Sequence, residues 1–351
     1  MTFENTTNRW LFSIAFTAVL LGAVEFGVRE YGFAPGDVSP NWLNFKAVDS
    51  LIVYDDFRVN DDAILVANAA NHQVYGLTVN SEGFNSPEFT KVDSTQPTLM
   101  LIGDSYTWGM SASPNDSAFA NIVRKVSGAN VHNLGIPAAD PVQYALVAER
   151  YIPKLKPDAV VLFFFVGNDI LLHDRIPVPN ENFYFFTNAG AILSEIDGVK
   201  FPNAEAAYSH LMHDKYWLTG NRNALEWLVS KSAVLSRLYS VRFRWAEKQR
   251  WENAIHDVSL TASYLLRVRD AVLAQGATFQ LVIIPELREA DMSREAYQVK
   301  YKALFHHPVL GPHISWPKVS EQHFVPYPDA HLNNSGHRVY ANFLLDSLQL
   351  P

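Results

Sequence analysis

The stretch Thr98-Leu99-Met100-Leu101-Ile102-Gly103-Asp104-Ser105 joins an uncharged apolar run to an abrupt polar stop. A short apolar run that ends at glycine and aspartate is typical of a strand buried on both faces of a parallel sheet. A serine in the turn after such a strand presents its hydroxyl at the carboxyl edge of the sheet. Because α/β sheets place their sites at this edge, the stretch predicts an α/β fold with Ser105 in a functional position.

Further apolar runs repeat this pattern along the chain, at Val131–Leu134, Ala159–Val166 and Phe279–Ile284. Between and after them lie segments with helical spacing of apolar residues: Ala118–Ser127, Pro141–Leu155, Ser259–Ala274 and a last helix from Asn334, with Val339, Tyr340, Phe343 and Leu344 on one stripe. Alternation of strands and helices predicts a three-layer α/β/α sandwich with a mainly parallel sheet and right-handed crossovers.

The order of segments predicts three regions. Residues 1–30 form an apolar N-terminal helix, 31–95 a connector with lead-in strands, and 96–351 the α/β domain. Brief strands are expected at Ile52–Tyr54 and Ala63–Val66, and a turn at Asn80–Asn85. An aromatic, then helical insertion at about 171–255 interrupts the α/β rhythm, and its position predicts that it borders the site.

Composition excludes several classes of function. The chain has 351 residues, 48% hydrophobic and 18% charged, with a net charge of −8, and this balance is globular. A net negative charge argues against a nucleic-acid partner. The absence of cysteine excludes disulfides, thiolate metal sites and a cysteine nucleophile.

The N-terminal segment Trp10–Val28 carries one charged residue, Glu25. A membrane-spanning helix needs roughly 20 residues, so the segment predicts an uncleaved anchor with the large C-terminal part outside the cytoplasm. A cleaved signal peptide is one alternative, although Gly22 and Ala23 are adjacent and no Ala-x-Ala follows, and a buried core helix is another.

Three residues that directly follow or lie just beyond predicted strands predict the chemistry of the site. Ser105 is the candidate nucleophile, and its own N–H can face the same reacting oxygen. Gly135 follows the strand Val131–Leu134 and can bring a second backbone N–H close to a substrate. Asn168 follows Ala159–Val166, where its amide can donate to an oxyanion. Taken singly, Ser105 is more typical of a helix cap and Gly135 of a plain turn, whereas Asn168 is as typical of an ordinary turn as of a donor.

His331 is the candidate general base, because it lies in the loop before the last helix with Asp329 two residues earlier. The carboxylate of Asp329 can orient the imidazole. His337 is the competing histidine, but its place inside the helix predicts a solvated surface residue. The remaining histidines lack metal-ligand spacing, and we expect neither a metal nor a cofactor.

These motifs resemble the SGNH hydrolase superfamily, the GDSL-type esterases, over about 75–350. The resemblance implies a flavodoxin-like fold, Ser105 as nucleophile, Gly135 and Asn168 as oxyanion donors, and Asp329 and His331 as acid and base. The turn Asn80–Phe84 also resembles a lead-in of membrane-anchored members. The sequence departs from the family pattern at three places. Pro137-Ala138-Ala139 stands in place of a further glycine, and Gly167 directly precedes Asn168 where the family often has Gly-x-Asn-Asp. The last motif is Asp-x-His in place of the commoner Asp-x-x-His.

The resemblance implies ester hydrolysis or O-acyl transfer. The short Asp-x-His spacing resembles members that act on extracellular polysaccharides, so an acylated carbohydrate or cell-envelope polymer is the expected substrate. Two alternatives are a non-catalytic glycan-binding or assembly protein and a lipid esterase at the membrane.

A cluster in the insertion could contact an anionic polymer or lipid headgroups, or could be the solvated face of a packed helix. It comprises Arg237, Tyr239, Arg242, Phe243, Arg244, Trp245, Lys248, Arg250 and Trp251.

Overall fold

The computed structural model describes residues 3–30, 57–59, 64–67, 73–74, 77–90, 93–137, 139–171, 195–196, 199–200 and 231–348. The chain divides into two compact units. One unit contains 1–46 and 208–250, and the other contains 47–207 and 251–351. The second unit holds the central sheet and every candidate site residue.

The central sheet has five parallel strands in the order β11-β10-β7-β5-β6. The strands are β5 (Thr98–Gly103), β6 (Asn130–Gly135), β7 (Ala159–Phe165), β10 (Thr278–Ile284) and β11 (Ile314–Ser315). Numbered from β5 in chain order, this is the flavodoxin-like arrangement 2-1-3-4-5. The predicted α/β class and parallel sheet are confirmed. The short edge strand β11 was not predicted.

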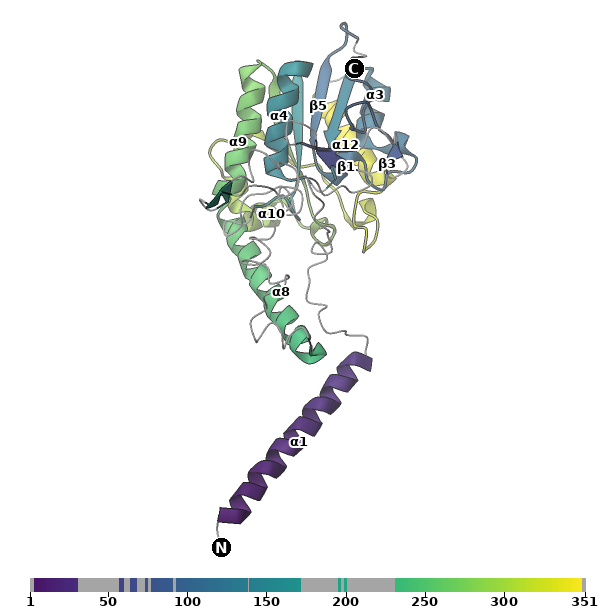
Figure 1. Ribbon diagram of the computed structural model, residues 1–351. Coiled ribbons are helices and arrows are strands. Elements are labelled where there is room, and N and C mark those ends of the chain that lie inside the picture. Colours follow the sequence, from purple (N-terminus) through teal and green to yellow (C-terminus); the bar gives the residue numbers. More distant parts are fainter. Residues whose placement is uncertain are drawn as a thin grey trace. The chain divides into compact units, whose positions relative to one another are not determined.

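Helices cover both faces of the sheet (Figure 1). Helices α4 (Pro141–Leu155) and α9 (Ser259–Ala274) pack together over one core, which includes Met100, Leu162 and Leu281. Helices α3 (Phe119–Ser127) and α12 (Asn334–Ser347) pack together over the other core. The two cores are the inner layers of an α/β/α sandwich.

The helix ends follow local chemistry. Asp140 caps α4 by accepting hydrogen bonds from the N–H groups of Val142 (2.9 Å) and Gln143 (3.4 Å), and Pro141 needs no partner at the first helical position. Asn333 caps α12 in the same way through Ser335 (2.9 Å) and Gly336 (3.1 Å). The cap of α12 fixes the exit of the loop that carries His331.

Part of the lead-in region belongs to the core of the α/β domain. Strands β1 (Phe57–Val59) and β2 (Leu65–Ala67) pair antiparallel, as do β3 (Gln73–Val74) and β4 (Leu77–Thr78). Core side chains of this region are Ile64, Val66, Val79, Phe84 and Phe89. The predicted strand at Ile52–Tyr54 lies outside the described residues.

Short elements complete the second unit. They are α2 (Ser105–Trp108), η3 (Asn115–Ser117), the hairpin β8 (Glu195–Ile196) and β9 (Val199–Lys200), η4 (Leu287–Glu289), α10 (Arg294–Lys300), α11 (Lys302–Phe305), η5 (Gly311–His313) and η6 (Glu321–His323).

The first unit contains helix α1 (Phe3–Glu30) and most of α8 (Ala233–His256). Within α1, the 19-residue segment Phe12–Glu30 is apolar enough to cross a membrane, with a mean hydropathy of 1.6 and no buried residue. A signal sequence meets the same criterion. Most of the predicted insertion at about 171–255 lies outside the described residues, and α8 is its main described helix.

Candidate active site

The candidate site begins at the point where the strand order reverses. Strand β5 pairs with β6 on one side and β7 on the other, and the chain crosses over between these neighbours. Ser105 follows β5 and Asn168 follows β7. In open parallel sheets the crevice at this switch point is the usual ligand position, so the topology alone brings these residues to one edge.

Ser105 is the first residue of the short helix α2, which is held at both ends. Asp104 caps its start by accepting a hydrogen bond from Tyr106 N–H at 3.0 Å. At its end, Asn133 Nδ2 donates to the Thr107 carbonyl at 2.8 Å, and Asn85 Nδ2 donates to the Trp108 carbonyl at 2.6 Å. These bonds tie the helix to β6 and to the lead-in turn. They fix the direction of the Ser105 side chain.

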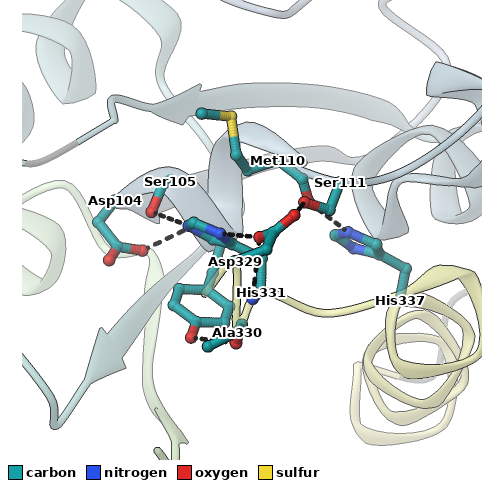
Figure 2. A network of polar contacts seen from close by, with 9 residues as sticks. Asp104, Ser105, Met110, Ser111, Asp329, Ala330, His331 and His337 are labelled. Atoms are coloured by element: carbon teal, nitrogen blue, oxygen red, sulfur yellow. Dashed lines mark hydrogen bonds and ion pairs between the residues drawn. The ribbon is translucent and has the colours of Figure 1, made fainter. Parts of the chain in front are cut away.

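The predicted serine, histidine and aspartate form one hydrogen-bonded chain (Figure 2). Ser105 Oγ lies 2.9 Å from His331 Nε2, and His331 Nδ1 lies 2.6 Å from Asp329 Oδ1. The candidate nucleophile and the candidate base are therefore within proton-transfer distance although they are 226 positions apart in sequence. The side chain of His331 is 22% exposed, so the group is accessible from solvent.

The hydrogen-bond partners of His331 determine which of its ring nitrogens carries the proton. An ionised carboxylate can only accept, so Nδ1 carries the hydrogen that bonds to Asp329. In neutral imidazole this leaves Nε2 as the acceptor for the Ser105 hydroxyl. The chain is thus arranged for His331 to remove the proton from Ser105.

The residue between the acid and the base has an unusual backbone. Ala330 lies in the left-handed region with φ of 61°. Its carbonyl accepts a hydrogen bond from the Tyr106 hydroxyl at 3.0 Å, and the Tyr106 ring lies 4.9 Å from the His331 ring between centroids. The sharp turn lets the Asp-x-His spacing bring both side chains together.

Sequence reasoning missed a second donor to the acid. The hydroxyl of Ser111 donates to Asp329 Oδ2 at 2.7 Å. Partial desolvation disfavours the charged carboxylate, but the bonds from Ser111 and His331 outweigh it and lower the pKa of Asp329 below its ordinary value. Asp329 therefore stays ionised as the partner of His331.

The expectation that His337 is a solvated surface residue is wrong. Its side chain is fully buried between α12 and α3, and its ring lies 5.6 Å from that of Phe119. Phe119 N–H donates to Nδ1 at 3.4 Å, so Nε2 carries the hydrogen and donates to the Met110 carbonyl at 3.3 Å. Burial lowers the pKa of His337 to about 4, so the ring stays neutral in neutral solution.

The buried stripe of α12 differs from the predicted one. It consists of Gly336, His337, Tyr340, Ala341 and Leu344, whereas Val339 and Phe343 are only partly buried.

Gly135 is required for close packing. A Cβ atom there would lie 2.3 Å from Trp108 N and 2.6 Å from the Thr107 carbonyl carbon, both backbone atoms of α2. Its N–H donates to Asn133 Oδ1 at 2.9 Å. The predicted donation from Gly135 to an oxyanion would have to replace that bond.

The carboxyl groups of Asp104 and Asp169, which follow β5 and β7, are fully buried. Burial raises the pKa of Asp104 to about 7, against the opposing effects of Tyr106 N–H and the Asn168 side chain. Burial and the neighbouring Asp104 raise the pKa of Asp169 well above its ordinary value, and the Tyr144 hydroxyl lies 2.9 and 3.0 Å from its two oxygens. Burial thus favours the uncharged form of both carboxyl groups.

Asn168 is exposed in the turn after β7. A hydrogen bond between its side chain and Asp104 lowers the pKa of that carboxyl group, against the larger effect of burial.

The described residues contain no group of three or more histidine, aspartate or glutamate side chains arranged to hold a metal ion.

The basic aromatic cluster of the insertion is described in part. Trp245 is exposed, whereas Trp251 is partly buried and packs against the α4–α9 core. The side chains of Tyr239, Arg242, Phe243, Arg244 and Arg250 lie outside the described residues.

No family model and no curated protein matches this chain. Solved structures with a similar fold include one titled TesA, with 12% identity over 72% of this chain and 98% of that chain, at a TM-score of 0.37. A carbohydrate esterase family 2 enzyme of Corynascus thermopiles has 14% identity over 74% and 68% of the two chains, at 0.37. The psychrotrophic esterase EstA of Pseudoalteromonas sp. has 8% identity over 72% and 97%, at 0.36.

Proposed function

We propose that this chain is a serine-dependent esterase or O-acyltransferase of the SGNH type, which carries an acyl group on Ser105 Oγ. The observation that carries the proposal is the continuous hydrogen-bonded chain from Ser105 through His331 to Asp329. A serine hydroxyl is a weak nucleophile at neutral pH and needs a base within hydrogen-bond distance, and His331 meets this requirement.

The first half-reaction follows from the tautomer of His331. Ser105 Oγ attacks the ester carbonyl carbon while its proton moves to Nε2, and the carbonyl oxygen becomes an oxyanion. When the intermediate collapses, the bond to the alcohol oxygen breaks and Nε2 returns the proton to the leaving alcohol. Asp329 stabilises the imidazolium that exists between these two transfers.

Backbone and side-chain N–H groups around Ser105 are the proposed oxyanion donors. The N–H of Ser105, at the first position of α2, has no partner within the helix. The Asn168 amide comes from the neighbouring strand β7. Gly135 N–H is a further donor when it leaves Asn133 Oδ1 and bonds to the substrate oxyanion instead. Each such donor contributes about 3–4 kcal/mol to the stability of the transition state.

The second half-reaction decides between hydrolysis and transfer. Water or a sugar hydroxyl attacks the acyl carbon and gives its proton to His331 Nε2. When this second intermediate collapses, the bond between the acyl carbon and Ser105 Oγ breaks, and Nε2 returns the proton to Oγ. Water yields a free acid, and a sugar hydroxyl yields a new ester. The same residues serve both reactions, so the acceptor that reaches the acyl group determines the product.

The proposed substrate is an acylated carbohydrate or cell-envelope polymer. Asp329 is 39% exposed and His331 22% exposed, which favours a substrate too large to be enclosed. The short Asp329–His331 spacing supports the same class by resemblance. The apolar helix α1 favours a second candidate, a lipid ester at a membrane surface.

We also propose that α1 remains attached as an anchor, with the α/β domain outside the cytoplasm. Glu25 supports retention of α1 because it accepts hydrogen bonds from Ala233 N–H (2.6 Å) and Val234 N–H (3.1 Å) at the start of α8. Arg29 adds a bond to the Lys231 carbonyl at 2.9 Å. A cleaved leader would leave the start of α8 without these partners. Mass spectrometry of the membrane-bound protein should therefore find residues 1–30 still present.

Turnover of p-nitrophenyl acetate by the full chain in detergent tests the enzymatic proposal. We expect release of p-nitrophenol by the wild type and by His306→Ala, which alters an exposed histidine, and loss of release in His331→Ala. Equal rates in His331→Ala and wild type would refute the proposal. Long-chain esters separate a lipid esterase from an acetyl esterase, and added glycans reveal transfer through an acetylated sugar product.

A further inference from the structure

Both oxygens of the Asp329 carboxylate are held by different partners. Oδ1 accepts from His331 Nδ1 at 2.6 Å and from His331 N–H at 3.3 Å. Oδ2 accepts from Ser111 Oγ at 2.7 Å. Because the Asp329 side chain is 39% exposed, water competes for both oxygens. The bond from Ser111 therefore restricts rotation of the carboxylate away from His331.

Ser111 reaches Asp329 from an unusual backbone conformation. Its φ is 64°, in the left-handed region that residues other than glycine, asparagine and aspartate seldom adopt. Ser111 follows directly after the loop that ends α2, so its hydroxyl belongs to the same local structure as Ser105. The bond between Ser111 and Asp329 thus joins the short segment that carries Ser105 to the loop that carries Asp329.

Helix α12 holds the backbone on both sides of Ser111. On one side, His337 Nε2 donates to the Met110 carbonyl at 3.3 Å. On the other, Asn334 accepts from Ser113 N–H at 3.0 Å and donates to the Ser113 carbonyl at 2.6 Å. Asp329 and His331 lie in the loop that leads into the same helix, so α12 positions both ends of the Ser111–Asp329 bond.

We infer that Ser111 is a positioning residue: its hydroxyl orients the Asp329 carboxylate toward His331, and His337 and Asn334 hold it in place. This inference rests on the proposed function for its kinetic consequence. Its structural content, that the Ser111 hydroxyl determines the His331–Asp329 bond, does not depend on turnover.

A pair of substitutions separates the hydroxyl from the backbone. Ser111→Ala removes the hydroxyl and keeps the Cβ atom, whereas Ser111→Gly removes the hydroxyl and relieves the left-handed strain. If the hydroxyl positions Asp329, both variants lose about tenfold in kcat with KM unchanged, because the lost bond is to a charged acceptor. If Ser111 only supports the turn, Ser111→Gly keeps the wild-type kcat, and the inference is wrong.

A spectroscopic measurement tests the inference without a substrate. The proton on His331 Nδ1, in its short bond to Asp329, should give a far-downfield ¹H resonance in the full chain, identified by its loss in His331→Ala. We expect the resonance to move or broaden in Ser111→Ala and Ser111→Gly. The control Ser263→Ala removes an exposed hydroxyl on α9 that bonds to the Leu260 carbonyl, and the resonance should stay in place.

The two measurements keep the inference and the proposed function distinct. A resonance that moves in a protein without esterase activity would support the positioning role and count against the proposed reaction. An active protein whose resonance is the same in the wild type and both Ser111 variants would overturn the positioning role alone.

Discussion

The hydroxyl of Tyr106 donates to the carbonyl of Ala330 at 3.0 Å, so the residue after Ser105 holds the residue before His331. Tyr106 is 3% exposed, and its ring also packs against Phe165 at 4.4 Å between centroids. One side chain therefore links the end of β5, the end of β7 and the loop that carries His331.

Tyr106→Phe should lower kcat by about three- to tenfold, because the Ala330 carbonyl loses a fixed donor and the His331 loop gains freedom. Steady-state kinetics with an activated ester measures the change. Tyr340→Phe is the matched control, since the Tyr340 hydroxyl donates to the Ile283 carbonyl at 3.1 Å in the core. It should cost about 1 kcal/mol of stability with kcat unchanged. Equal kinetic losses in both variants would remove Tyr106 from this role.

Asp329→Asn should reduce kcat by about 10³- to 10⁴-fold. The amide can donate to Nδ1, which places the imidazole proton on Nε2 and leaves no acceptor for the Ser105 hydroxyl. The control Asp346→Asn makes the same change at an exposed position of α12 and should retain wild-type kcat. A loss of less than tenfold in Asp329→Asn would show that the carboxylate does not orient the base.

Gly135→Ala should destabilise the domain by about 2–3 kcal/mol, because the new Cβ would press on the backbone of α2. Activity should fall as α2 moves and carries Ser105 with it. Gly128→Ala is a useful control, since its φ is 68° but a Cβ there meets nothing within 4 Å. It should cost about 1–2 kcal/mol in stability with no loss of kcat. Wild-type activity in Gly135→Ala would contradict the packing argument.

His337 should make the folded protein sensitive to acid. Burial lowers its pKa to about 4, below the ordinary value of 6.5, so the unfolded chain binds more protons between these pH values. Stability from this group is complete above pH 6.5 and is lost as the pH falls toward 4, by up to about 3 kcal/mol.

His337→Gln keeps an amide donor for Met110 and an acceptor for Phe119 but does not titrate. Denaturant unfolding of both proteins at pH 7 and pH 4.5 gives the comparison. The wild type should lose more stability than His337→Gln over this interval. Parallel losses would show that His337 does not resist protonation in the folded state.

The strands of the sheet and the helices that cover it could be predicted because each has a local sequence signal. The apolar run Thr98–Ile102 ends in a glycine, and α4 begins at Asp140-Pro141, a cap followed by proline. The predicted bounds of α4 and α9 agree with the structure. The roles assigned to Ser105, Asp329 and His331 remain predictions that the kinetic experiments test.

The surroundings of the triad could not be predicted in the same way. Ser111 lies in a loop without a motif, and its bond to Asp329 spans 218 positions and depends on a left-handed φ. His337 did have a signal, because it precedes Tyr340, Ala341 and Leu344 by three, four and seven positions on the buried stripe of α12. That helical spacing is hard to recognise because histidine is polar and the other residues of a buried stripe are usually apolar. The raised pKa values of Asp104 and Asp169 required knowledge of burial that no local pattern supplies.

Covalent labelling of the full chain with a fluorophosphonate, followed by peptide mass spectrometry, tests the central claim most directly. The account predicts one adduct, on Ser105, absent in Ser105→Ala and formed at least tenfold more slowly in His331→Ala because the base is missing. Labelling that persists in Ser105→Ala, or that proceeds at the same rate without His331, would contradict it.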